Sequence, residues 1–149
     1  MRKLSLFIVL ACTLPTVADD AANKKIVDAL QGTWVPVELT RGGMRAPDEI
    51  VKSLQLEISK DTATLITTRD GMTIKKPATM VIDASQKPIA IDLTPNEGAE
   101  KGKPMLGIVK IDGKTLELCF TDETDDAKVR PEAFDGSKGK QIYLKFMKK

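Results

Sequence analysis

The chain has 149 residues with 23 basic and 21 acidic side chains, and this near balance gives no sign of nucleic acid or an acidic membrane surface as a partner. It contains no histidine, which excludes Ser-His-Asp and Cys-His catalysis as well as zinc or haem held by histidine. The length suits a single domain with a substantial hydrophobic core.

The first residues predict an export signal. Arg2 and Lys3 precede an apolar run over residues 4–14, and small residues at 16–18 offer a cleavage point. The run is too short to span a bilayer, which needs about 20 apolar residues. We therefore expect a secretory signal peptide over residues 1–18 and one domain over residues 19–149. In the alternative, residues 9–11 precede Cys12 as the lipid-bearing cysteine of a lipoprotein.

Cleavage after Ala18 removes two basic residues and no acidic ones. The remaining 131 residues carry 21 acidic and 21 basic side chains, so the slight positive charge of the whole chain belongs to its signal. Cys119 is the only cysteine left, and no internal disulfide can form. An exported protein of this kind relies on its core for stability.

A short helix is expected before the first strand. Asp19 and Asp20 can cap a helix over residues 21–30, and Gly32 lies where it would end. From Gly32 onward the hydrophobic period changes from helical to alternating. Strict alternation places Trp34 and Glu38 on one face of the first strand, so either a bulge near Pro36 resets the pattern or Glu38 faces a wet interior.

Short strands with turn signals every eight to twelve residues fill the rest of the chain. Asp70-Gly71 and Asp112-Gly113 are strong hairpin signals, and Pro47 opens a helical turn as its first residue. The pattern predicts an all-β, antiparallel barrel of about eight short strands with a short N-terminal helix. The expected strands are residues 33–40, 53–59, 62–68, 72–76, 78–83, 89–94, 105–111, 115–120 and 141–148.

Two longer loops interrupt the strands, at residues 95–104 and 121–140. Loops of this length in a compact domain are usually functional or mobile. We expect the second loop to be poorly ordered except for an anchor at Arg130, Pro131 and Phe134, because Phe134 is its only large apolar side chain. Both loops are candidate lips of a binding site.

Several short sequence motifs occur in order along the chain, and together they resemble one family. They are Leu30-Gln31-Gly32-Thr33-Trp34, Lys87-Pro88, Ile91-Asp92-Leu93, Gly107-Ile108-Val109-Lys110, Asp112-Gly113, Thr115-Leu116-Glu117-Leu118-Cys119-Phe120 and Arg130-Pro131-Glu132-Ala133-Phe134. The set is similar to the uncharacterised family of small, often exported lipocalin-like domains of planctomycete bacteria. The resemblance implies an antiparallel lipocalin-like barrel, and it implies no reaction and no catalytic residues.

The chain departs from true lipocalins in two places. It lacks a Thr-Asp-Trp turn in mid-chain, and its last strand offers Lys145 or Lys148 where lipocalins place an arginine over the tryptophan ring. These departures weigh against a retinoid-type ligand.

Four residues are candidates for ligand binding: Trp34, Glu38, Arg130 and Phe134. For Trp34 the competing interpretation is a ring that closes the barrel floor. For Arg130 it is an anchor that holds the long loop to the barrel through a carboxylate or carbonyl groups.

Other residues are interpreted as structural. Cys119 points away from the face of Leu118 and Phe120 and is expected to be a packed thiol. The acidic cluster at residues 122–126 lacks the glycine and distal glutamate of an EF-hand and is expected to be a solvated charge run rather than a calcium site. The sequence alone does not show whether carboxylate pairs such as Glu38 with Glu57, or Asp83 with Asp92, lie close together.

The sequence therefore predicts a non-enzymatic, exported domain, without cofactor or metal, that binds a small apolar or amphipathic ligand in its barrel. The small inward candidates Ala63, Thr67, Gly107 and Val109 favour free space there. The alternative is an envelope interaction or structural module with a filled barrel. A cavity of about 300 Å³ or more would favour the ligand. We expect a monomer, with an envelope protein as the other partner and no transmembrane span in the mature chain.

Overall fold

The computed structural model describes residues 17–121 and 129–149. One helix, α1, precedes the sheet, and a shorter one, α2, follows its second strand; they span Val17–Leu30 and Asp48–Lys52. The strands are β1 (Gly32–Arg41), β2 (Met44–Arg45), β3 (Leu54–Ser59), β4 (Thr62–Arg69), β5 (Met72–Asp83), β6 (Ile89–Pro95), β7 (Met105–Asp112), β8 (Thr115–Thr121) and β9 (Gln141–Lys148).

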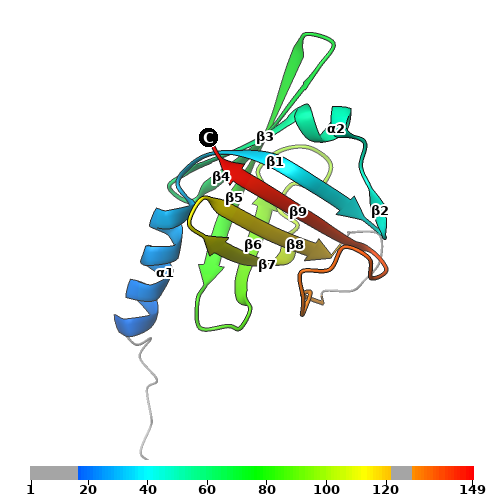
Figure 1. Cartoon of the computed structure of the whole chain (residues 1–149). Coiled ribbons are helices and arrows are strands. Elements are labelled where there is room, and N and C mark those ends of the chain that lie inside the picture. Colours follow the sequence, from blue (N-terminus) through cyan, green and yellow to red (C-terminus); the bar gives the residue numbers. More distant parts are fainter. Residues whose placement is uncertain (1–16, 122–128) are drawn as a thin grey trace, which may run out of the picture.

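Eight of these strands form a closed antiparallel barrel, which confirms the predicted fold class. Successive strands from β3 to β9 pair in sequence order, β1 pairs with β3, and an additional β1–β9 pairing closes the sheet. β2 is the extra strand, paired only with the end of β1. Figure 1 shows α1 beside one end of the barrel. The tip of the β4–β5 hairpin projects beyond the body of the barrel.

A β-bulge in β1 resolves the alternation problem around Glu38. The register against β9 shifts between Pro36 and Glu38, so one extra residue, Val37, is left without a partner. Trp34 and Pro36 are buried in front of the bulge, and behind it Leu39 rather than Glu38 lies opposite the inward-facing Leu144. Of the two alternatives drawn from the sequence, the bulge is the one observed, and Glu38 lies on the outer face.

The two strands expected over residues 72–76 and 78–83 are one continuous strand, β5, and the predicted break was wrong. The carbonyl of Pro77 accepts a hydrogen bond from the N–H of Asn96, 3.0 Å away and just past the end of β6. The nitrogen of Pro77 faces the same side, where no ladder partner requires a donor. A proline is tolerated in a strand at such an edge position.

The segment between β1 and β3 differs from the expectation in two details. The two-residue strand β2 has no alternating pattern that marks it in the sequence. Pro47 was expected as the first helical residue, but it occupies the N-cap position of α2, with ψ of 147°, and the helix begins at Asp48. Pro47 still supplies the carbonyl that accepts from the N–H groups of Ile50 and Val51.

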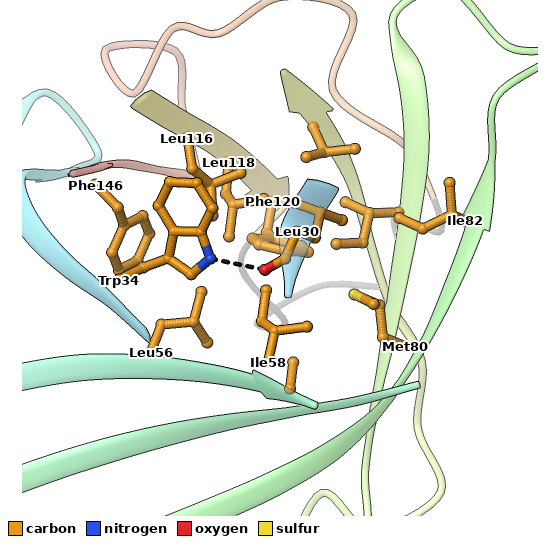
Figure 2. Packing of buried hydrophobic residues seen from close by; sticks show 13 residues of the cluster. Leu30, Trp34, Leu56, Ile58, Met80, Ile82, Leu116, Leu118, Phe120 and Phe146 are labelled. Carbon is orange, nitrogen blue, oxygen red and sulfur yellow. Dashed lines mark hydrogen bonds between the residues drawn. The ribbon is translucent and has the colours of Figure 1, made fainter. Parts of the chain in front are cut away.

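The hydrophobic core occupies the half of the barrel next to α1. Leu30, Trp34, Leu116 and Phe146 are essentially inaccessible to solvent, and Ile26 of α1 packs against the same cluster. The indole N–H of Trp34 donates to the carbonyl of Leu30 over 2.8 Å, which ties the first strand to the end of the helix. Figure 2 shows the indole surrounded by core side chains, with this hydrogen bond drawn as a dashed line.

Candidate ligand cavity at the open end of the barrel

The two ends of the barrel are built differently. At one end, tight turns join β3 to β4 and β7 to β8, and α1 packs over the opening with Leu30 fully buried. At the other end lie the long connections between β1 and β3, β6 and β7, and β8 and β9, together with the β4–β5 hairpin. We refer to these as the closed end and the open end.

A cavity of about 670 Å³ lies at the open end. It is lined on the barrel side by inward-facing and mostly apolar side chains from β3 to β7: Leu56, Ala63, Leu65, Ile74, Lys76, Ala78, Leu93, Pro95 and Met105. Ligand pockets in proteins are typically concave, apolar and about 300–1,000 Å³ in volume. The cavity therefore has the size and the lining of a small-molecule site.

Small residues explain why space remains here. Ala63 and Ala78 are direct cross-strand partners on β4 and β5, so two adjacent inward positions carry only a methyl group each. The sequence pointed to Ala63 for this reason but missed Ala78. A pair of alanines at matched inward positions is the signal that identifies the cavity wall.

Gly107 does not contribute free space, although it was also among the small inward candidates. A Cβ built at this glycine would overlap the aromatic ring of Phe120, its cross-strand partner on β8. The Phe120 ring thus fills the volume that the missing side chain leaves, and Val109, the next inward residue of β7, is in the packed core. The empty part of the barrel is on the β3–β6 side.

The loop between β6 and β7 forms a lip of the cavity, as expected from its length and position. Glu97, Gly98, Ala99 and Glu100 line the opening. The carboxylate of Glu100 is paired with the ammonium of Lys103 at 3.0 Å, within the same loop. The lip is therefore polar, whereas the wall beneath it is apolar.

A second hollow of about 640 Å³ lies where β1 ends and β9 begins. Leu39 and Ile142 supply its inward-facing apolar wall, and Arg41, Arg45 and Lys140 line it with basic groups. It is more open to solvent than the first cavity. We treat it as part of the mouth of the barrel.

Trp34 lies away from both cavities, in the core of the closed end. Its exposed fraction is zero, and the ammonium of Lys148 lies 5.2 Å from the centroid of its ring. This placement agrees with the interpretation of the ring as the barrel floor. Its candidate role in ligand binding would require the core around it to open.

Glu38 faces outward, across the barrel wall from the interior. Its partner on β9 is Lys145, and it lies near the phenol of Tyr143. The Tyr143 hydroxyl donates to Glu117 over 2.7 Å, and Lys110 pairs with Glu117 at 3.6 Å. Burial, together with the carboxylates of Glu117 and Glu38, raises the pKa of Tyr143. Glu38 thus belongs to a charged network on the outer face.

Arg130 anchors the loop that precedes β9. Its guanidinium donates to the carboxylate of Asp92 at 2.6 Å and to the carbonyl groups of Gly107 and Ile91 at 2.7 and 3.3 Å. The anchor interpretation drawn from the sequence matches this geometry. The carboxylate of Asp92 is paired with this arginine, whereas the carboxylate of Asp83 accepts hydrogen bonds from the N–H and the hydroxyl of Ser85.

The anchored loop covers a second packed layer on the outer wall. Pro131 and Gly136 are buried and Phe134 is half-buried, while Ala90, Ile108 and Cys119 on the outer face of the strands are also buried. Burial raises the pKa of the Cys119 thiol, which is free, as expected of a packed cysteine. Neither Phe134 nor Arg130 lines either cavity.

Other predictions fall partly or wholly outside the described residues. The acidic cluster and the first part of the 121–140 loop lie at residues 122–128, which the structure does not describe. Among residues 17–121 and 129–149, no group of three or more acidic or cysteine side chains is placed to hold a metal ion. Over the same residues, no helix is both long enough and apolar enough to cross a membrane.

Comparison with known proteins returned no match: no family model fits the chain, and no curated sequence or solved structure is significantly similar to it.

Proposed function

We propose that the chain is an exported, lipocalin-like domain that binds a small apolar or amphipathic ligand in the open end of its barrel. The observation that carries the proposal is the cavity of about 670 Å³, walled by apolar side chains and open to solvent. Burial of apolar ligand surface against such a wall is favourable by roughly 25 cal/mol per Å² before the costs of association.

Several parts of the proposal come from the sequence alone. Export is proposed from the signal pattern of residues 1–18. Membership of the planctomycete lipocalin-like family is proposed from the resemblance of the short sequence motifs. A non-enzymatic role is part of the same proposal, since the side chains around the cavity wall are hydrocarbon for the most part. Binding, rather than chemistry, is what such a wall favours.

The cavity also bears on the alternative of an interaction module. That alternative has a barrel interior filled by side chains, whereas a cavity that is partly inside the barrel and partly bordered by the β6–β7 loop, about 670 Å³ in all, favours a ligand. The closed half is filled and the open half is not. The ligand hypothesis is therefore the one that we carry forward.

A matched pair of variants tests the proposal. Ala78→Phe places a ring in the cavity, whereas Val81→Phe places the same ring on the outer face of the same strand, where Val81 is 59% exposed. We expect calorimetric titration with decanol to give a heat of binding for the parent chain and for Val81→Phe, and at least about a tenfold weaker affinity for Ala78→Phe. Circular dichroism would check that both variants fold.

Equal affinity of all three proteins would place the ligand elsewhere. Absence of binding to the parent chain, both for decanol and for the other single-chain amphiphiles used below, would refute the proposed function. Native mass spectrometry of protein purified from its own source would then show whether a different small molecule accompanies it.

A further inference from the structure

The carboxylates of the described barrel strands lie on the outer face only, beside basic residues such as Lys110 and Lys145. Strand register places six carboxylates on the outer face, one on each of six strands: Glu38, Glu57, Asp83, Asp92, Asp112 and Glu117. The ionisable residues at inward register positions of β1, β4, β5 and β9 are all basic: Arg41, Arg69, Lys76 and Lys148. No strand carboxylate therefore faces the interior in the described part of the barrel.

Two of the outer carboxylates are paired with cations. Asp92 binds Arg130 and Glu117 binds Lys110, so these negative charges are compensated outside the wall. Of the basic residues at inward positions, Lys76 is the one that lines the cavity, and no strand carboxylate shares its face of β5 or of the neighbouring strands. Fixed charges of one sign at the mouth of a low-dielectric cleft attract ligands of the opposite sign.

Lys76 is the inward cation that lines the cavity. It lies between Ile74 and Ala78 on the same face of β5, and its cross-strand partner is Leu65, so its neighbours on the wall are apolar. Within the residues that the structure describes, no hydrogen bond or ion pair joins its ammonium to another side chain. Lys76 is exposed at the mouth of the cavity, and the next inward residue of β5 is Ala78, whose small side chain helps to leave the cavity open.

The acidic groups at the opening lie on the lip and not on the wall. Glu100 is neutralised by Lys103, which leaves Glu97 as the nearest uncompensated carboxylate of the cavity lining. Lys75, the neighbour of Lys76, faces the other side of β5 but also borders the opening. The wall thus offers a hydrocarbon surface that ends in an ammonium.

We propose that the ligand is a single-chain amphiphile with an anionic head group, its chain lying in the cavity and its carboxylate, sulfate or phosphate bound at Lys76. This inference rests on the proposed function and adds the polarity of the ligand to it. A charge-assisted hydrogen bond from an ammonium to an anionic oxygen supplies the discrimination.

Chain-matched ligands separate the inference from the proposed function. Calorimetric titrations of the full chain would use decanoate and decyltrimethylammonium below their micellar concentrations, and decanol below its solubility limit. We expect decanoate to bind about tenfold more tightly than decanol, the order expected of one charge-assisted hydrogen bond at a partly exposed site, and the cation to bind most weakly. The preference for decanoate should shrink as ionic strength rises.

Lys76→Gln should bring decanoate and decanol to within about twofold of each other, and Lys76→Arg should restore the preference. Lys114→Gln is the matched control, because it makes the same change of net charge on an exposed residue at the closed end. Equal affinities of the parent chain for decanoate and decanol, or tightest binding of the cation, would overturn the anionic preference and leave the proposed function standing. A preference that survives in Lys76→Gln would also overturn the assignment. Failure of all three ligands to bind would refute both proposals.

Discussion

The ammonium of Lys148 lies 5.2 Å from the centroid of the Trp34 ring, and the two residues are direct cross-strand partners on β9 and β1. The pair sits at the point where the barrel closes on itself. Lys148 is exposed while Trp34 is fully buried, so the lysine covers the ring from the solvent side. The last strand thus places a cation over the tryptophan ring, although the residue is lysine rather than the arginine of lipocalins.

Trp34→Ala should lower the free energy of unfolding by about 3–5 kcal/mol, because removal of a large buried ring leaves a cavity between elements that cannot collapse into it. Trp34→Phe should cost less, since it keeps most of the ring and loses the hydrogen bond to Leu30. Urea denaturation measures both variants. A loss below about 1 kcal/mol for Trp34→Ala would mean that the ring does not support the barrel floor.

Lys148→Met should cost roughly 0.5–1 kcal/mol in the free energy of unfolding, since methionine keeps the packing and loses the cation–π contact at a solvent-facing site. The double variant with Trp34→Phe measures whether the two side chains are coupled. Lys149→Met is the matched control for the loss of one positive charge at the same end of β9. An identical effect of the two lysine variants would assign the change to net charge and not to the ring.

Gly107→Ala should destabilise the protein by about 1–3 kcal/mol, the usual cost of overpacking a core. The added methyl group would overlap the ring of Phe120, which lies against the glycine inside the barrel. In the background of Phe120→Leu, the same change should cost clearly less, because the obstructing ring is gone. Additive losses in thermal or urea denaturation would show that the close approach of Phe120 is not the cause.

Tyr143 allows a pH test because it is the only tyrosine of the chain. Its pKa is raised above the ordinary value of 10, first by burial and then by the hydrogen bond to Glu117. Folding therefore favours the neutral phenol, and this contribution to stability is present below pH 10 and is lost as pH rises through the higher folded pKa.

Spectrophotometric titration of the phenol should give a midpoint above that of free tyrosine, with unfolding accompanying ionisation. Glu117→Gln should lower the midpoint, since it removes the negative charge that opposes the phenolate. Lys114→Gln, which changes no group near Tyr143, should leave it in place. An ordinary midpoint in the parent chain would contradict a half-buried phenol that is hydrogen-bonded to Glu117.

Much of the fold follows from the sequence because alternation and turn chemistry are local. Asp70-Gly71 and Asp112-Gly113 form the turns that they predict, and both glycines have the positive φ that such turns need. The bulge after Pro36 was one of two open alternatives, because strict alternation conflicts with the burial of Trp34. The predicted break of the strand at Pro77 was wrong. The pairing of β5 with β6 ends at the residue after Pro77, so the missing N–H is not needed there, and a local sequence pattern does not show where such pairing ends.

The candidate site was less predictable, because a cavity is a property of several strands at once. The sequence identifies Ala63 as a small inward residue, but only the register shows that Ala78 lies opposite and that Phe120 fills the space at Gly107. The ligand-binding candidates chosen from the sequence were residues of distinctive type instead. Trp34 and Arg130 stand out in the chain, and the structure uses one in the core and the other as an anchor.

The Arg130 anchor should protect Cys119 from reaction. Arg130 binds Asp92 and two carbonyl groups, and the loop it holds covers the outer wall where the thiol is buried. Arg130→Met should loosen this cover and increase the rate at which a disulfide reagent modifies Cys119 at neutral pH, by about tenfold or more if opening is eased by roughly 1.4 kcal/mol. The experiment would use the Cys12→Ser background, so that Cys119 is the only thiol that reacts.

Arg130→Lys should give an intermediate rate, because lysine keeps the charge, but its shorter side chain carries the ammonium less far than the Nη1 nitrogen that makes all three contacts. Asp92→Asn should also accelerate modification, and its combination with Arg130→Met should add little if the two residues act as a pair. Lys138→Met, in the same loop but exposed, is the matched control and should react at the parent rate. Unchanged reactivity in Arg130→Met would mean that the buried contacts of Pro131 and Gly136 hold the loop in place without the arginine.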